Sequence, residues 1–375
     1  DTMRTSDSVG ISSYYFKTAP ATGAGPYLLF TAGGNPYGHL GHNNEISYSS
    51  PKQIPGTQWS FANTHLRAQY AIKTDGTLWA WGDSDNGKTA LNSEIDRSSP
   101  TQIPGTQWNS TSGGRDAKAI ATKTDGTLWV WGRNLHGELG LNDTVYHSSP
   151  VQLPGTNWVL PRYSANDGGV ATFAFKTDGS MWVWGGASAR DTPLNGTVYY
   201  SSPKQVPGTW ATDHGKFTTG QGDGAIKTDG TLWVWGTNGS GRLGLTDMAQ
   251  RSSPTQLPGT EWNWISFGQQ SFGIKTDGTL WAWGIDTSGG LGLNDGSGGD
   301  RSSPTQIPGT EWATVSNGNY HTIATKTDGT MWMWGSSGRI PTNDTVNYSS
   351  PIQLPGTQWV YGVCAEDDVM LLKNA

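Results

Sequence analysis

Apolar and polar positions follow a pattern that recurs seven times along this chain. The segment Lys-Thr-Asp-Gly-x-(Leu/Met)-Trp-x-Trp-Gly begins at Lys73, Lys123, Lys176, Lys227, Lys275 and Lys326. A second segment, Ser-Ser-Pro-x-Gln-(Ile/Leu/Val)-Pro-Gly-Thr, is followed in every copy by a tryptophan: Trp59, Trp108, Trp158, Trp210, Trp262, Trp312 and Trp359. Short apolar runs between Pro, Gly and Asp predict β-strands, and a fixed period predicts a repeat architecture.

Each repeat predicts four short strands. One passes through Thr-Gln-Ile, one starts at the tryptophan after Pro-Gly-Thr, one is the apolar stretch before Lys-Thr, and one is Thr-Leu-Trp-x-Trp. Asp-Gly between the last two suits a tight hairpin turn, because glycine readily takes a positive φ. Four strands in 47 to 53 residues, the spacing of successive repeat lysines with Lys373 included, match one blade of a β-propeller.

The two ends of the chain hold the halves of one repeat. The last repeat stops at Lys373, where Lys-Thr-Asp-Gly would otherwise continue, while residues 29–33 (Leu-Phe-Thr-Ala-Gly) match Leu-Trp-x-Trp-Gly. We therefore predict an all-β, seven-bladed propeller over residues 27–375, closed by pairing of the N- and C-terminal segments. Residues 28–33 would complete a blade whose other strands come from residues 352–373. Closure hides the sheet edges.

Residues 1–26 precede the repeats. They carry Tyr14-Tyr15-Phe16, and we predict an arm that packs on the propeller or on a neighbouring subunit.

The tryptophans predict the core. Nineteen of the 20 occupy repeat positions, and Trp264 alone stands outside the pattern. In Trp79-Ala80-Trp81 both faces of the strand are apolar, as expected for a blade between two neighbours. Burying ~200 Å² of each ring at ~25 cal/mol/Å² corresponds to roughly 5 kcal/mol, an upper bound. We interpret the repeat tryptophans as core packing.

Composition excludes several classes of protein. The net charge is −6 and no run of Lys or Arg is present, which argues against nucleic-acid binding. The single cysteine, Cys364, rules out an internal disulfide framework. No apolar run approaches the ~18 residues that span a bilayer, so we expect a soluble chain without membrane insertion. No nucleophile elbow, Walker loop or His-Glu-x-x-His motif occurs, and we expect neither cofactor nor metal.

The repeats resemble the regulator of chromosome condensation family of seven-bladed propellers. Gly318-Asn319-Tyr320-His321, the Asp-Gly with aromatic-x-Trp-Gly at residues 328–335, and Asn134-x-x-Gly-x-Leu-Gly140 carry that resemblance. It implies the fold over residues 27–375. The founding member exchanges guanine nucleotide on a small GTPase with a protruding wedge and docks on chromatin with a basic tail, and neither element is visible here. The uniform repeats are most similar to the bacterial, phage and environmental branch.

Candidate binding residues are sought outside the repeated framework, at the odd tryptophan and around the loops that differ between repeats, since loops on a rigid scaffold carry recognition. They are Trp264, the acidic loop residues Asp295 and Asp300, and the tyrosines Tyr199 and Tyr200. The recurrent Asp of Asp-Gly is interpreted as a turn former. His39 and His42 lack an evident third ligand for a metal. The loop 293–300 lacks the spacing of an EF-hand.

These features favour a non-catalytic binding or structural scaffold that recognises a protein or a surface glycan through its blade loops. We expect an exterior accessory protein, outside the cell or on a virion: a virion decoration or fibre component, or a secreted adhesin. Two alternatives remain open, because a fold does not fix a function. One is a protein inhibitor or an interaction propeller of the nucleotide-exchange type. The other is a glycan-acting enzyme.

Overall fold

The computed structural model describes residues 29–373, apart from 34, 57, 66, 115–116, 164–170, 187–192, 196–197, 214, 221, 297–298, 319, 337–345, 358 and 365–368. The predicted arm at residues 1–26 lies outside this part. Two compact units are formed: residues 1–163, 172–177 and 199–204 make unit 1, and residues 164–171, 178–198 and 205–375 make unit 2.

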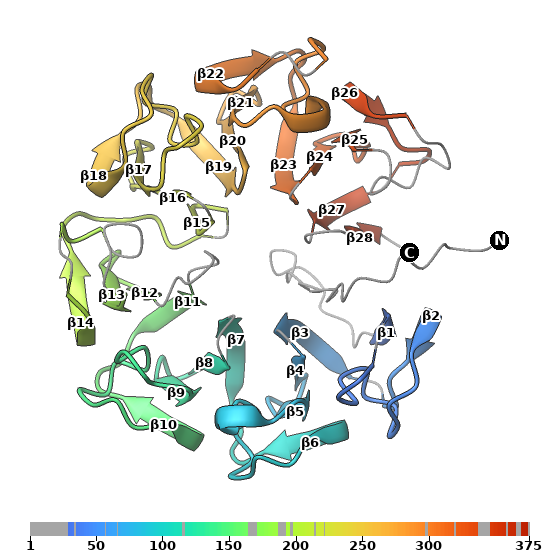
Figure 1. The fold of residues 1–375 in the computed structure, drawn as a ribbon, viewed down its shortest axis with the longest axis vertical. Helices are drawn as coiled ribbons and strands as arrows, with labels where there is room; N and C mark the ends of the chain where they lie inside the picture. The colour runs from blue at the N-terminus through green and yellow to red at the C-terminus, as the bar shows by residue number, and fades with distance from the viewer. Residues whose placement is uncertain are drawn as a thin grey trace. The chain divides into compact units, whose positions relative to one another are not determined.

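The described residues are almost entirely strands and loops (Figure 1). The first half of the chain forms the strands β1 (Phe30–Gly33), β2 (Tyr48–Gln53), β3 (Trp59–His65), β4 (Ala68–Lys73), β5 (Leu78–Gly82), β6 (Arg97–Ile103), β7 (Trp108–Gly114), β8 (Lys118–Lys123), β9 (Leu128–Gly132), β10 (His147–Leu153), β11 (Trp158–Tyr163), β12 (Thr172–Lys176), β13 (Met181–Gly185) and β14 (Tyr200–Val206).

The second half forms the strands β15 (Phe217–Thr218), β16 (Gly222–Ile226), β17 (Leu232–Gly236), β18 (Arg251–Gln256), β19 (Trp262–Phe267), β20 (Gln270–Lys275), β21 (Leu280–Gly284), β22 (Arg301–Ile307), β23 (Trp312–Asn317), β24 (His321–Lys326), β25 (Met331–Gly335), β26 (Tyr348–Gln353), β27 (Trp359–Cys364) and β28 (Val369–Lys373). Two short 3-10 helices, η1 (Asp85–Gly87) and η2 (Thr287–Gly289), interrupt the loops after β5 and β21.

Six four-stranded sheets contain the strands in chain order, from β3–β6 to β23–β26. Five of them start at a repeat tryptophan strand, all six end at a Ser-Ser-Pro strand, and in the sheet β15–β18 Trp210 forms an isolated bridge to Lys227 ahead of β15. The Asp-Gly hairpins are confirmed, for example by the pairing of Ile72 with Leu78. The strand with Ser-Ser-Pro lies at a sheet edge, where a proline's missing N–H costs no ladder hydrogen bond. The predicted four-stranded blades are confirmed.

The seventh set of strands is divided between two two-stranded sheets, β1–β2 and β27–β28. The expectation that residue 352 starts the last blade is wrong, because β26 pairs with β25, with Trp332 opposite Gln353. The Ser-Ser-Pro strand of this seventh set is instead β2. It pairs with β1, with Gln53 opposite Phe30. The reason is that the loop after Trp-Gly turns the chain back as a hairpin, whereas the Pro-Gly turn leads it to the next sheet. The pairing of β1 with β28 remains a prediction.

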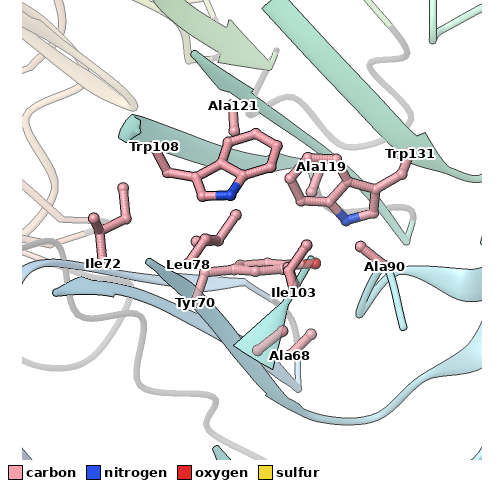
Figure 2. Packing of buried hydrophobic residues seen from close by; sticks show 11 residues of the cluster. Ala68, Tyr70, Ile72, Leu78, Ala90, Ile103, Trp108, Ala119, Ala121 and Trp131 are labelled. Carbon is pink, nitrogen blue, oxygen red and sulfur yellow. The ribbon is translucent and has the colours of Figure 1, made fainter. Parts of the chain in front are cut away.

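Successive sheets of unit 1 pack through large aromatic side chains. Figure 2 shows Trp108 and Trp131, from the sheet β7–β10, over Tyr70, Leu78 and Ile103 of the sheet β3–β6. All five are almost fully buried, and the rings of Tyr70 and Trp131 meet edge to face with centroids 6.0 Å apart. This core therefore lies between the sheets, as the two apolar strand faces predicted.

The two tryptophans of Trp-x-Trp have different surroundings. The second, such as Trp81, is buried, and its Nε1 donates to the carbonyl of His39 in the preceding loop at 2.9 Å. The first, Trp79, is only half-buried. Its ring centroid lies 4.1 Å from the Nζ of Lys73, and the ring centroid of Trp59 lies 5.0 Å from the same atom. The interpretation of all repeat tryptophans as core is thus corrected for the first member, which forms one wall of a cation–π site. Lys123, Lys227, Lys275 and Lys326 repeat this arrangement.

The Asp of Asp-Gly anchors that half-buried tryptophan. The Nε1 of Trp79 donates to Thr77 Oγ1 at 2.9 Å, and the Thr77 hydroxyl donates to Asp75 Oδ1 at 2.7 Å. This hydroxyl bond, together with one from the Thr77 backbone, lowers the pKa of the Asp75 carboxyl. The predicted structural role of the repeat aspartates is consistent with these bonds.

In five of the described loops after β-strands that end in glycine, a loop glycine sets the distance to the next sheet. A Cβ added to Gly241 would lie 2.5 Å from the Cα of Ser302, and the φ of Gly241 is +70°. Gly38, Gly87, Gly137 and Gly289 contact the next Ser-Ser-Pro strand in the same way. Only glycine satisfies both the close approach and the left-handed backbone.

We predict that Gly241→Ala destabilises the protein by roughly 2–4 kcal/mol, because left-handed strain and overpacking add. Gly239→Ala is the matched control, since Gly239 has an ordinary φ and no atom within 4 Å of an added Cβ. Chemical denaturation measures both. Equal stabilities for the two variants would contradict the packing role of Gly241.

We predict that closure requires β1. Deleting residues 1–34 should lower the melting temperature markedly or cause aggregation, because it exposes an unpaired strand edge. Deleting residues 1–26 removes the arm and keeps β1, and this control should melt close to the full chain. If the chain lacking residues 1–34 melts like the full chain, closure by the terminal strands is wrong.

Candidate interaction surface

A buried asparagine organises three of the loops that follow a Trp-Gly strand in the described part of the chain. In the loop after β9, Asn134 accepts the backbone N–H of Leu139 at 2.9 Å and donates to the carbonyl of Asp143 at 3.1 Å. Asn35 and Asn238 make the same pair of bonds. These loops are therefore fixed frames, and the side chains on their outer side are held in defined positions.

The loop after β9 holds one ring of an aromatic stack in unit 1, in which His136 is half-buried and Tyr199 is exposed. The ring of His136 lies on that of Tyr199, with centroids 4.4 Å apart and planes inclined by 22°. The His136 backbone N–H donates to the buried carboxylate of Glu138 at 2.6 Å, which fixes the turn. Leu135 and Tyr199 are each about half exposed. Flat rings beside an apolar side chain form the kind of surface that aromatic-rich protein interfaces use.

Two of the candidate residues, Tyr199 and Tyr200, lie at the start of β14. Tyr199 forms the stack, and Tyr200 is half-buried as the first residue of β14. Sequence reasoning missed Leu135 and His136 as binding residues, because both lie inside a framework motif. The available signal was His136 itself, since the matching positions hold Tyr37, Asn86 and Ser240.

The acidic candidates belong to the loop after β21 in unit 2. Asp295 pairs with the guanidinium of Arg301, and the Oδ1 of Asp300 accepts the backbone N–H of Asp286 at 3.3 Å. Both residues are exposed. The carboxylates thus help to order their own loop while part of each remains accessible to a partner. The described residues contain no group of three or more His, Cys, Asp or Glu side chains that could hold a metal ion.

Trp264 fills a space between two sheets of unit 2. Its Nε1 donates to the carbonyl of Val315 at 2.9 Å, and a Cβ on Gly215 would lie 2.4 Å from its ring. The side chain is half-buried. These contacts give the indole a packing role, and a ligand would reach only its outer part.

No helix in the described part of the chain is long and apolar enough to cross a membrane.

Repeated four-stranded antiparallel blades that end at a Ser-Ser-Pro edge strand define a β-propeller repeat protein. Residues 125–160, 229–271 and 277–325 match the model of the regulator of chromosome condensation (RCC1) repeat. These three segments are therefore similar to RCC1 repeats, which confirms the predicted resemblance. The proposed bacterial, phage or environmental origin remains a prediction.

Solved structures confirm the fold. The crystal structure of human WBSCR16 superposes with a TM-score of 0.71 at 17% identity, covering 93% of this chain and 99% of that chain. Prp20p from Saccharomyces cerevisiae gives a TM-score of 0.68 at 17% identity, covering 94% and 91%. Yeast RCC1 (Prp20) in its complex with Kap60 gives a TM-score of 0.66 at 17% identity, covering 92% of this chain and 89% of that chain. Among curated protein sequences, none matches this chain.

We predict that Trp264→Phe destabilises the chain by about 1–3 kcal/mol, because it leaves the Val315 carbonyl without its donor and removes ring volume. Urea denaturation gives the value. Unchanged stability, combined with a loss of affinity for an oligosaccharide, would show that Trp264 acts as a sugar platform instead.

Proposed function

We propose that this chain is a non-catalytic scaffold that binds a protein partner through its blade loops. The observation that carries this proposal is the stack of the half-buried His136 ring on the exposed Tyr199, with the exposed Leu135 next to His136 in a loop fixed by buried hydrogen bonds. A preorganised aromatic surface loses little conformational freedom on binding, which favours recognition.

The similar propellers support a protein partner. The structure of Prp20p is described with its binding properties to Gsp1p and histones, and yeast RCC1 (Prp20) was solved bound to Kap60. For the present chain we propose protein recognition as the general function, and a nucleotide-exchange-type interaction remains the alternative reading.

We extend the proposal to an exterior accessory role, as a virion decoration or fibre component or a secreted adhesin. Support comes from the physical character of the blades. Almost fully buried tryptophans lie between successive sheets, and half-buried tryptophans line the cation–π sites. Extensive apolar burial of this kind stabilises a protein under dilution and physical stress.

The test is a binding assay on the native source. We expect labelled full-length chain to bind saturably to the particle or envelope fraction. The double variant His136→Ala/Tyr199→Ala should raise the Kd by about tenfold or more, as truncation of a central aromatic anchor does. Gln152→Ala, on the exposed edge strand β10 of the same sheet, is the matched control and should bind like the wild type.

Two outcomes would contradict this proposal. One is equal affinity of the double variant and the wild type. The other is turnover of a polysaccharide by the purified chain, with activity lost in Asp295→Asn or Asp300→Asn, which would favour the glycan-acting enzyme.

A further inference from the structure

Three loop tips of unit 1 expose an apolar side chain at the same position of the repeat. Ile46, Ile95 and Val145 each lie five residues before the proline of Ser-Ser-Pro, and they are 61%, 68% and 59% exposed. We call these three residues the tip row. A single exposed apolar residue needs no explanation, but recurrence at one structural position does.

The backbone holds each member of the tip row outward. The N–H of Ile46 donates to Asn44 Oδ1 at 2.9 Å, that of Ile95 to Ser93 Oγ at 3.1 Å, and that of Val145 to Asp143 Oδ1 at 3.0 Å. The turn is therefore closed by a side chain two residues earlier in all three loops. An ordered turn keeps the apolar group accessible.

Hydrogen bonds connect each tip to the next one. The N–H of Asn43 donates to the carbonyl of Ser98 at 2.6 Å, and the N–H of Asn92 donates to that of Ser148 at 2.7 Å. Ser98 and Ser148 follow Ile95 and Val145 by three residues. The first loop is thus hydrogen-bonded to the base of the second, and the second to the base of the third, so the three tips are held in a fixed order on neighbouring sheets.

Among the residues that flank Ile46 and Ile95 in sequence, three carboxylates outnumber one cation, the half-buried Arg97. Glu45 and Glu94 directly precede Ile46 and Ile95, Asp96 follows Ile95, and all three carboxylates are exposed. The chain as a whole carries a net charge of −6. A surface that alternates apolar and carboxylate groups is complementary to apolar groups alternating with Lys or Arg.

We infer that the tip row binds a basic amphipathic polypeptide segment of a partner. Its apolar side chains would cover Ile46, Ile95 and Val145, while its Lys or Arg side chains would pair with Glu45, Glu94 and Asp96. This inference rests on the proposed scaffold function and names the class of partner. Unit 2 exposes Val198 and Val346 at the same repeat position, at 58% and 55%.

The test uses the full chain and a synthetic amphipathic peptide of Leu and Lys as the probe, with affinity measured by fluorescence anisotropy. Ile46→Ser/Ile95→Ser/Val145→Ser should raise the Kd about tenfold, and Glu45→Gln/Glu94→Gln should raise it several-fold and flatten its salt dependence. Gln102→Ser/Gln152→Ser, on exposed edge-strand positions, is the control and should leave the Kd unchanged.

Three results would overturn the inference. The first is equal affinity of the triple serine variant and the wild type. The second is equally tight binding of a Lys and Ser peptide of the same charge, which would reduce the effect to charge alone. The third is a wild-type dimer that the triple variant converts to monomer, because the occupant would then be a second copy of this chain. If the triple variant fails to fold, Ile95→Ser, at the most exposed of the three positions, replaces it.

Failure here is distinguishable from failure of the scaffold function. If the triple serine variant still binds the particle or envelope fraction as the wild type does, the tip row is not the partner site and the scaffold function stands.

Discussion

The close approach of each loop to the next sheet is the constraint on which this molecule depends. A loop glycine contacts the Cα of the first serine in the Ser-Ser-Pro strand of the next sheet, as Gly137 does with Ser201. This contact leaves no room for a Cβ. The same loop offers its carbonyl to the second tryptophan of the next blade, as Lys88 does to Trp131 at 2.8 Å. The loop therefore positions both a tryptophan ring and the backbone of the Ser-Ser-Pro strand in the next sheet. Because neighbouring blades within each unit dock in this way, the repeat motif describes an interface between blades as much as a blade.

This interface explains why the repeat residues vary so little within the chain while their neighbours vary freely. Asn134, Gly137 and Leu139 are committed to the frame by burial and hydrogen bonds. Leu135 and His136 lie between these framework positions and project outward, so different residues there leave the docking of the blades unchanged. A fixed frame with free outer positions is the usual basis for recognition on a repeat scaffold.

The lysine of Lys-Thr-Asp-Gly shows how a charged residue contributes to such a frame. Lys73 lies between Trp59 and Trp79, and its ammonium group contacts both rings. The half-buried Trp79 satisfies its own N–H through Thr77 and, beyond it, Asp75. One short segment of sequence thus supplies a turn, an aromatic wall and a cation, and this linkage accounts for the recurrence of the whole segment rather than of isolated residues.

The sequence by itself determined the strands, the Asp-Gly hairpins, the blade architecture and the family resemblance, because these depend on local periodicity and turn chemistry that repeats make visible. It misassigned the strand near residue 352, since the same residues pair with whichever strand the intervening loop brings beside them. Only the tertiary structure decided that Trp79 is half-buried while Trp81 is buried, that Trp264 packs under Gly215, and that Tyr199 meets His136. Those contacts join residues distant in the chain, and their geometry is set by how neighbouring sheets dock, which no local pattern encodes.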